Sequence, residues 1–556
     1  MNGTIHRSLS FIVAAAVACG EPSGAGTPDL SNAPVARVAV TPNVVSLSRS
    51  GTQQLQVTVF EAKGHQLTGR SVSFSTNAPN IATVSSTGLV TAVANGQALV
   101  TATAGGVTTP VTVLVGTVPA PTGTITLQPQ QSFQTIVGWE GHNQIGQLEC
   151  NPTAYQAYKE PLQDRIVNEL GINRVRLEIR SDTENPVDHF ARFRAGTIDY
   201  KTWRTTWFVP VNDNADPATI NPAGFQWSNL DYDVEQSVIP LRTRLAARGE
   251  KLYVNLNYVD FQASTSFEQM RDPKEYAELM LATFQHLQQR YGFVPDAVEL
   301  VLEPDNTPWR APDLARALVA TGDRLKAAGF TPDFIAPSNT SMSAALTYFD
   351  AMVQTPRVLE YLTELAYHRY SGVSDPTLAL IGQRAKQYGI RTSMLEHIGS
   401  GFEDLFKDLT VGNVSAWQQF ALAYCGSQDN PDGGGIYYQV NQAVPSAPRV
   451  NISNRSKMLR QVFLFVRAGA VRYGASSTSG AFQPMAFRNV DGKHVVVVKA
   501  SSGGAFSVAG LPADTYGIKY ATANAWDQNP VDVTIAAGGT MTAHIPAPGV
   551  LTVYRR

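Results

Sequence analysis

An alternation of short apolar strands and longer amphipathic helices runs through residues 124–474 and constrains the fold more than any other feature. Eight strands are expected to end near Gly141, Ser181, Asp260, Glu303, Ser338, Tyr370, Glu396 and Gln439. Helices fit between them, for example at residues 272–290, 311–328, 376–388 and 415–424. This order predicts a (β/α)8 TIM barrel with insertions. A doubly wound sheet would alternate in the same way, but no glycine-rich phosphate loop follows the first strand.

Two glutamates stand where barrel strands should end. Glu303 follows the apolar run 298–302, and Glu396 follows the run 391–395. The C-terminal ends of the strands form the catalytic face of a barrel. A carboxyl that protonates the leaving oxygen and a carboxylate that attacks the sugar are what glycosidic bond hydrolysis needs. Either glutamate alone would be read as a strand cap or an ion-pair partner, but the pair in this context favours catalysis.

The composition is that of a globular protein with several domains. The chain has 556 residues, of which 43% are hydrophobic and 16% charged, so about three domains are expected. The formal net charge is -2, with no basic block, and this argues against a nucleic-acid partner.

Residues 1–19 are predicted to be an export signal, and residues 20–34 a flexible tether. Small residues at Ala16 and Ala18 fit ordinary signal cleavage. A small residue directly before Cys19 also fits lipoprotein processing, in which Cys19 carries the lipid. Both processing routes predict an exported protein. Ordinary signal cleavage predicts a periplasmic or extracellular protein, and lipoprotein processing predicts a lipoprotein of the cell surface or outer membrane. The apolar run is too short to span a bilayer, so a lipid on Cys19 is the only membrane contact expected.

Three cysteines do not make a disulfide framework. On the predicted strand order, Cys150 follows the first barrel strand on the upper face, and Cys425 follows the seventh helix on the lower face. We therefore expect no bridge between them. No Cys/His spacing indicates a metal site, and no cofactor is expected.

Residues on both sides of the barrel alternate apolar and polar side chains. Residues 35–116 predict a small β-sandwich, 117–123 a linker, and 475–556 a C-terminal β-sandwich to which residues 125–127 could add a strand. The segment 80–92 and the run that begins at Gly96 resemble the bacterial immunoglobulin-like group 2 domain. This resemblance implies a spacer or adhesive module.

The barrel and its tail resemble clan A retaining glycoside hydrolases, most closely family 30. The resemblance is carried by residues 134–141, 171–176, 366–370, 465–472 and 486–492, of which the last two segments are the most specific. It implies that Glu303 is the acid/base and Glu396 the nucleophile of a retaining mechanism, with carboxyls about 5–5.5 Å apart. It also implies that Arg176 keeps Glu396 ionised.

Other residues are candidates for binding a carbohydrate substrate. His368 and Tyr370 match positions of the family's sixth strand that line the cleft. Aromatic rings bury the apolar C–H faces of sugars, and the candidates for such stacking are Trp139, Trp309, Tyr258, Tyr437 and Tyr438. Asn339 and Gln439 are candidates for hydrogen bonds to sugar hydroxyls.

One position departs from the resemblance and keeps other functions open. The clan usually has an asparagine before the acid/base, where this chain has Leu302. A leucine cannot bond the sugar 2-hydroxyl, although Asn255 or Asn257 could replace that donor. A non-catalytic carbohydrate-binding or adhesive protein on a degenerate barrel is therefore the main alternative. A hydrolase that uses other carboxylates, such as Glu140, Glu178 or Asp260, is the third.

Overall fold

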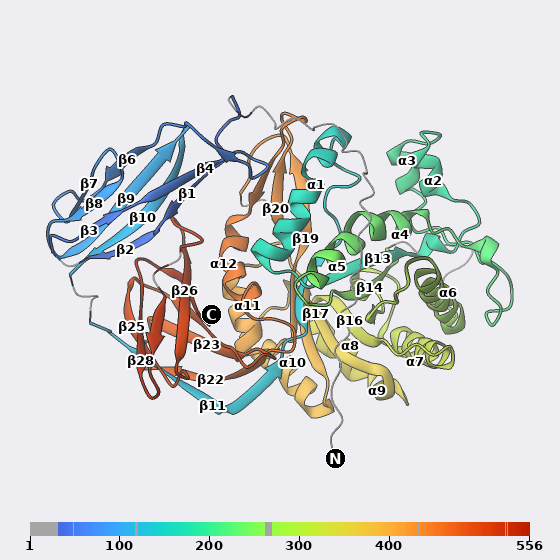
Figure 1. Ribbon diagram of the computed structural model, residues 1–556. Coiled ribbons are helices and arrows are strands. Elements are labelled where there is room, and N and C mark those ends of the chain that lie inside the picture. The colour runs from blue at the N-terminus through green and yellow to red at the C-terminus, as the bar shows by residue number, and fades with distance from the viewer. Residues whose placement is uncertain are drawn as a thin grey trace, which may run out of the picture.

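The computed structural model describes residues 30, 32–47, 49–116, 120–261, 269–431, 434–528, 530 and 532–556. These residues form an N-terminal β domain, a central barrel and a C-terminal β-sheet domain (Figure 1). The predicted export signal and Cys19 lie outside the described residues. Within the described part of the chain, no helix is long and apolar enough to cross a membrane.

The central domain is a closed barrel of eight parallel strands, in which β12 pairs with β19. Its strands are β12 (Gly138–His142), β13 (Arg174–Arg180), β14 (Tyr253–Val259), β15 (Ala297–Glu299), β16 (Asp333–Ser341), β17 (Leu362–Ser371), β18 (Arg391–Glu396) and β19 (Ala416–Gly426). The helices that follow them are α1 (Pro152–Arg165), α5 (Ile239–Ala246), α6 (Pro273–Tyr291), α7 (Ala311–Ala327), α8 (Met342–Met352), α10 (Asp375–Tyr388), α11 (Phe402–Thr410) and α12 (Asn454–Phe463). The short helix α9 (Val358–Tyr361) precedes β17. The predicted (β/α)8 barrel is thus confirmed.

Local chemistry explains why helix α6 begins and ends where the sequence predicts. The side chain of Asp272 accepts a hydrogen bond from the backbone N–H of Lys274, and Pro273 occupies the first turn, where its missing N–H costs nothing. Gly292 ends the helix in the left-handed conformation with φ 68°, which favours glycine. Buried residues such as Leu279 lie on the face that packs against the barrel.

The eighth barrel strand was predicted wrongly. Residues 415–424, expected to be a helix, form most of β19, and the predicted last strand is β20 (Ile436–Asn441), which lies outside the closed barrel. Glutamine, alanine and leucine in this segment have good intrinsic helix propensity. Barrel closure overrides that preference, because β19 is hydrogen-bonded to β18 on one side and to β12 on the other. The strand β21 (Arg449–Ile452) then forms a hairpin with β20.

This change also makes the expectation about the cysteines wrong. Cys425 lies near the C-terminal end of β19, on the same face as the loop after β12 that contains Cys150. The two residues form a disulfide with a Cα–Cα distance of 5.6 Å. Next to it, the backbone N–H of Ala423 donates to Gln144 O at 3.0 Å. The bridge therefore joins the two strands that close the barrel, at its upper end.

The C-terminal domain is one nine-stranded sheet that also includes β11 (Thr124–Thr135), from before the barrel. Its other strands are β22 (Val471–Ser477), β23 (Phe482–Arg488), β24 (His494–Ala500), β25 (Gly504–Ala509), β26 (Asp514–Thr522), β27 (Val533–Ile535), β28 (Thr540–Ile545) and β29 (Gly549–Arg555). β11 pairs antiparallel with β22 and parallel with β25. Buried Phe482, Phe506 and Leu551, from different parts of the sheet, share one core. The sheet therefore curls into a sandwich-like domain.

The N-terminal domain packs its own apolar core between small sheets. Its strands are β1 (Arg37–Thr41), β2 (Val44–Leu47), β3 (Thr52–Gln54), β4 (Gln56–Phe60), β5 (Gln66–Leu67), β6 (Ser73–Thr76), β7 (Ala82–Val84), β8 (Leu89–Ala92), β9 (Gly96–Ala104) and β10 (Val107–Val115). The hydroxyl of Thr112 on β10 lies 3.1 Å from that of Tyr520 on β26, and both side chains are buried. This domain therefore contacts the C-terminal sheet domain, as Figure 1 also shows.

An insertion between β13 and α5 carries α2 (His189–Arg194), α3 (Tyr200–Arg204) and α4 (Ser228–Asp233). Its tryptophans pack it onto the barrel: Trp203 is 1% exposed, and the guanidinium of Arg180, at the end of β13, lies 4.0 Å from the ring centre of Trp207. The insertion thus covers one side of the upper barrel face.

Candidate active site

Glu303 and Glu396 meet at the upper end of the barrel. Glu396 is the last residue of β18, and Glu303 lies four residues beyond the end of β15. One carboxylate oxygen of each and one ring nitrogen of His368 all lie within 4.8 Å of one another. The two carboxylate side chains are 12% and 10% exposed, so both are largely buried but still reach solvent. The predicted pair is therefore brought together in one place.

Glu396 is held by a cation and a hydroxyl. Arg176 Nη2 donates to Glu396 Oε2 at 2.5 Å, and the hydroxyl of Tyr370 donates to Oε1 at 2.9 Å. Burial raises the pKa of Glu396, but Arg176, His368 and the two hydrogen bonds outweigh burial, so that the pKa lies below its usual value. Glu396 is therefore ionised at neutral pH, with both carboxylate oxygens engaged.

Glu303 is positioned by its backbone and by a histidine. Its φ of 50° places it in the left-handed region, which is uncommon for a residue with a side chain and is often found at functional sites. Its N–H donates to Ser338 O at 3.1 Å, which ties the end of the fourth barrel strand to the fifth. His368 Nδ1 lies 3.1 Å from Glu303 Oε1. Two neighbouring strands therefore orient the carboxyl.

Arg176 is fully buried on β13 and reaches across the barrel to β18. Besides Glu396, it donates to Leu395 O at 3.4 Å. Burial works against its charge, but the pKa of Arg176 is raised by Glu396, Glu299 and Glu178, in that order. Arg176 therefore stays protonated and has the predicted place beside the carboxylate of Glu396.

All five aromatic residues predicted to stack on sugars lie in the core, and this prediction is wrong for each of them. A ring with no exposed surface cannot contact a substrate, and the side chains of Trp139, Tyr258, Trp309, Tyr437 and Tyr438 are all 0% exposed. Their polar atoms are also bonded within the protein. Trp139 Nε1 donates to Val466 O at 2.6 Å, and the hydroxyl of Tyr438 donates to Arg165 O at 3.0 Å.

Trp309 and Tyr258 lie closer to the site but beneath its surface. Their rings make an edge contact, with centres 6.0 Å apart, and Trp309 Nε1 lies 3.5 Å from Asp260 Oδ2. The hydroxyl of Tyr258 donates to Gln269 Oε1 at 3.1 Å. The sequence shows that these rings are near a strand end, but not which face of the strand they occupy.

The polar candidates divide in the same way. Asn339 is fully buried on β16, one residue beyond Ser338, and neither atom of its amide has a hydrogen-bond partner among the described residues. Tyr437 and Gln439 lie on β20, outside the barrel. The hydroxyl of Tyr437 donates to Glu140 O at 2.8 Å, and the amide of Gln439 donates to Gln428 O at 2.5 Å. Tyr437 and Gln439 therefore support the structure, and only Asn339 is near the glutamate pair.

Phe420 was missed by the sequence analysis. It lies on β19, is partly exposed, and stacks on His142 with ring centres 5.4 Å apart. The guanidinium of Arg176 lies 5.8 Å from the centre of its ring. It is therefore an aromatic surface next to the group that holds Glu396. Assigning residues 415–424 to a helix removed the signal that would have identified it.

The other carboxylates named by the sequence are engaged elsewhere. Glu140 is 0% exposed and paired with Arg174, so no substrate can reach it. Glu178 lies 2.9 Å from His142 Nε2; burial opposes its ionisation, but this contact lowers its pKa to about 2. Asp260 accepts a hydrogen bond from the hydroxyl of Ser181 at 3.2 Å. None of them forms a pair of facing carboxyls like that of Glu303 and Glu396.

The spacing of donor atoms in Glu303, His368 and Glu396 would also suit a metal ion. The arginine beside Glu396 argues against this use, because a buried guanidinium 2.5 Å from a carboxylate oxygen repels a second cation there. The arginine therefore disfavours a metal ion at these three residues.

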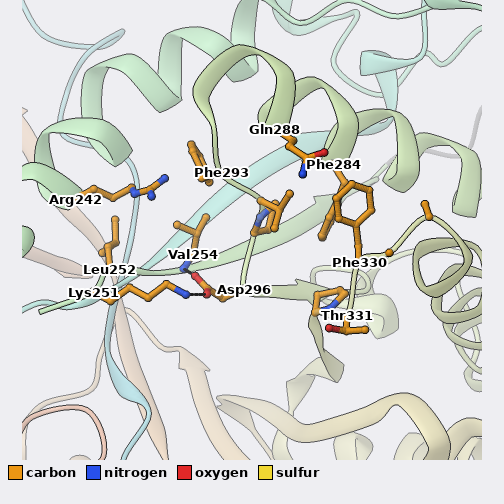
Figure 2. Close-up of a pocket in the computed structure, with 15 residues that line it drawn as sticks. Arg242, Lys251, Leu252, Val254, Phe284, Gln288, Phe293, Asp296, Phe330 and Thr331 are labelled. Carbon is orange, nitrogen blue, oxygen red and sulfur yellow. Dashed lines mark hydrogen bonds and ion pairs between the residues drawn. The ribbon is translucent and has the colours of Figure 1, made fainter.

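A pocket of about 550 Å³ lies at the other end of the barrel (Figure 2). It is lined by Arg242 and Phe293, among others, and by residues next to the N-terminal starts of β14 and β15. The Lys251–Asp296 ion pair of 2.5 Å lies at its edge. Because catalytic residues of barrels lie at the C-terminal ends of the strands, this pocket is not part of the candidate active site.

Comparison with known proteins agrees with these domains. Residues 34–115 match the family model of the bacterial Ig-like domain (group 2). No curated protein sequence matches the chain at a significant level.

Several solved structures share the fold of the barrel and the C-terminal domain. A family 30 xylanase C catalytic domain from Talaromyces cellulolyticus is 15% identical, with a TM-score of 0.55 over 78% of this chain and 100% of that one. An endo-β-1,6-glucanase is 14% identical, with a TM-score of 0.54 over 78% and 94%. A conserved exported protein from Bacteroides fragilis is 13% identical, with a TM-score of 0.57 over 78% and 100%. The chain thus combines a bacterial Ig-like domain with a barrel and β-sheet domain that have the fold of family 30 glycoside hydrolases.

Proposed function

We propose that this chain is an exported retaining β-glycoside hydrolase that acts on a polysaccharide or glycoconjugate. The observation that carries the proposal is the approach of Glu303 and Glu396, whose nearest carboxylate oxygens lie within 4.8 Å. Retaining enzymes have carboxyl groups about 5–5.5 Å apart, whereas inverting enzymes leave room for a water molecule between carboxyls about 6.5–9.5 Å apart. The short separation therefore supports the retaining mechanism.

The contacts of the two glutamates support a division of roles. Glu396, kept ionised by Arg176 and Tyr370, attacks the anomeric carbon while the bond to the leaving oxygen breaks. Glu303, beside His368, gives its proton to that oxygen. In the second step Glu303 takes a proton from water, the water oxygen bonds to the anomeric carbon, and the ester bond to Glu396 breaks.

Structural likeness gives a class of substrate to test first. The similar structures include xylanases and an endo-β-1,6-glucanase. A β-linked polysaccharide outside the cell is therefore the substrate class that we propose. The Ig-like domain, and the likeness to an exported protein, support export. The predicted lipid on Cys19 would then anchor the protein at a membrane surface.

The test is hydrolysis of a panel of β-linked glycans, with xylan and β-1,6-glucan first, by the parent chain and by Glu303→Gln and Glu396→Gln. Each substitution should lower the rate by about 10²-fold or more, since a positioned acid or base contributes about 10²–10⁴-fold. Glu403→Gln, at a side chain that is 72% exposed, is the matched control and should behave like the parent. With an activated aryl glycoside, azide should accelerate Glu303→Ala and give a β-glycosyl azide. Full activity of Glu396→Gln would refute the proposal.

One observation favours a second candidate function, carbohydrate binding without hydrolysis. Leu302 is 5% exposed, and its side chain offers no hydrogen bond to a sugar at the position before Glu303. Binding of a glycan by the parent chain, with no hydrolysis in the same panel, would establish this second function.

A further inference from the structure

The proposed reaction needs groups that recognise the sugar under attack, and the glutamate pair does not supply them. Both carboxylate oxygens of Glu396 are already bonded, one to Arg176 and one to Tyr370. In the proposed mechanism Glu303 exchanges protons with the leaving oxygen and with water. The side chain of Leu302 has no polar atom. Hydroxyl groups of the sugar therefore need acceptors elsewhere at the upper end of the barrel.

Phe420 begins a row of contacts that leads away from Glu396. The guanidinium of Arg176, which bonds Glu396, lies 5.8 Å from the centre of the Phe420 ring. The Phe420 ring also stacks on His142, with ring centres 5.4 Å apart and an angle of 18° between the ring planes. His142 Nε2 in turn lies 2.9 Å from Glu178 Oε1. The contacts thus connect the nucleophile to Glu178 through the neighbouring strands β19, β12 and β13.

Glu178 lies on the same inner face of the barrel as Arg176. The two residues are two positions apart on β13, and side chains at this spacing point to the same side of a strand. Arg176 reaches across the barrel to Glu396, so this side is the interior. Two residues advance a strand by about 7 Å. Glu178 therefore lies about the length of one sugar ring above Arg176, toward the catalytic end of the barrel.

The carboxylate of Glu178 can still accept a hydrogen bond from a ligand. The backbone N–H of Gln144 donates to His142 Nδ1 at 3.3 Å, so Nε2 is the nitrogen that carries a proton toward Glu178 Oε1. The other oxygen, Oε2, lies 3.8 Å from Arg180 Nη2, which is beyond hydrogen-bonding distance. Arg180 instead donates to Asn229 Oδ1 at 2.9 Å. The side chain of Glu178 is 18% exposed, so a donor from outside the protein can reach it.

An aromatic ring beside a carboxylate is suited to a neutral sugar. The ring packs on the apolar C–H face of the sugar, and a carboxylate forms stronger hydrogen bonds with hydroxyl groups than a neutral acceptor does. We propose that Phe420 and Glu178 recognise the sugar that Glu396 attacks. Phe420 stacks on the apolar face of this sugar, and Glu178 accepts hydrogen bonds from the hydroxyl groups on the edge far from the anomeric carbon.

His142 is then a positioning residue, because it contacts both the Phe420 ring and the carboxylate of Glu178. The proposal rests on the proposed retaining function. It narrows the substrate class to glycans in which the attacked sugar is neutral and has a free hydroxyl group on its far edge.

The experiment changes Glu178 and one hydroxyl group of the substrate together. The substrate is the shortest β-glycoside that the parent hydrolyses, found among p-nitrophenyl glycosides and oligosaccharides of the panel. Its analogue lacks the hydroxyl group at C3 of the attacked sugar. The values of kcat/KM for both compounds are measured with the parent and with Glu178→Gln, which keeps the shape of the side chain and removes its charge.

The expected result is a loss of discrimination between the two compounds. In the parent, removal of the hydroxyl group should lower kcat/KM by about tenfold or more, since it removes a hydrogen bond to a charged group. In Glu178→Gln the same removal should lower kcat/KM by only about threefold, because the acceptor is neutral. Any difference in intrinsic reactivity between the two compounds cancels when the variants are compared.

The matched control is Asp231→Asn. Asp231 also pairs with a histidine, His286, at 2.6 Å, and its side chain is 15% exposed, but the pair joins helices α4 and α6. This variant should discriminate between the two compounds as the parent does. His142→Asn leaves the carboxylate of Glu178 in place and removes the ring that orients it. It should reduce the discrimination by a smaller factor than Glu178→Gln, and it tests the role if Glu178→Gln does not fold.

Two kinds of outcome would overturn the inference for different reasons. If the parent hydrolyses both compounds equally well, or if Glu178→Gln discriminates between them by the same factor as the parent, Glu178 does not bind this sugar. A fall of kcat/KM by one common factor for both compounds would show that Glu178 is only structural. If the parent hydrolyses no glycoside or glycan at all, the proposed function fails, and the role of Glu178 fails with it.

Discussion

Replacing Tyr370 by phenylalanine tests how the reactivity of Glu396 is set. The hydroxyl of Tyr370 donates to Glu396 Oε1 at 2.9 Å, and Tyr370 is one of the groups that hold the pKa of Glu396 below its usual value. The substitution removes one oxygen atom and leaves the ring, so it should not disturb packing. We expect the pKa of Glu396 to rise, because the ionised form loses a donor and the protonated form loses little.

The magnitude follows from the geometry. A hydrogen bond to a charged group contributes about 1.5–3 kcal/mol. Tyr370 is 39% exposed, so solvent weakens its contribution and the lower end of that range applies. Since one pKa unit corresponds to about 1.36 kcal/mol, the pKa of Glu396 should rise by about one unit. The acid limb of kcat/KM, which reports the free enzyme, should move up by about one pH unit.

The assay is the pH dependence of kcat/KM for parent and Tyr370→Phe on the best glycan of the panel. Tyr424→Phe is the control, because Tyr424 is 40% exposed and makes no contact with Glu396 among the residues that the structure describes. Thermal unfolding supplies a second readout. A carboxyl with a lowered pKa stabilises the fold above its unfolded pKa of about 4.3, and this stabilisation disappears as the pH falls through the folded pKa. An acid limb that stays in place, or equal shifts in both variants, would refute the assigned role.

Three further predictions follow from other parts of the structure. Reducing the disulfide between Cys150 and Cys425 should lower the unfolding temperature measured by calorimetry. The reason is that a bridge that closes a loop of this length contributes up to about 5 kcal/mol to the free energy of unfolding. An unchanged unfolding temperature would contradict a structural role for the bridge. Burial raises the pKa of Asp182 to about 7 and that of Asp233 to about 6, so between about pH 4 and pH 7 these two carboxyls hold more protons in the folded chain than in the unfolded chain. Their contribution to stability therefore falls as the pH rises through this range. The unfolding temperature should be higher at pH 5 than at pH 8, and the reverse order would refute this prediction. Phe420→Ala should raise KM for the glycan by about tenfold. Aromatic contacts contribute about 0.5–1.5 kcal/mol in addition to the free energy gained from burying their area. A KM equal to that of the parent would show that the Phe420 ring does not contact the sugar.

The candidate site was largely predictable because its residues belong to local patterns. Glu303 and Glu396 each follow a short apolar run, and such runs are recognisable without knowing their neighbours. Arg176, His368 and Tyr370 lie within the strands that the alternation predicts, and the structure brings all three to the glutamate pair. The residues whose role depends on the side of the strand they face were predicted less well.

The sequence by itself determined the order of strands and helices through the seventh barrel strand, the flanking β domains and the two glutamates at or just beyond strand ends. These features depend on the spacing of apolar residues and on turn residues within short segments, so they can be recognised from the local sequence alone. Only the tertiary structure decided that β19 closes the barrel, that Cys150 meets Cys425, and that Trp139 is buried while Phe420 is partly exposed. The physical reason is that barrel closure pairs residues far apart in the chain, and this pairing selects which face of each strand is turned inward.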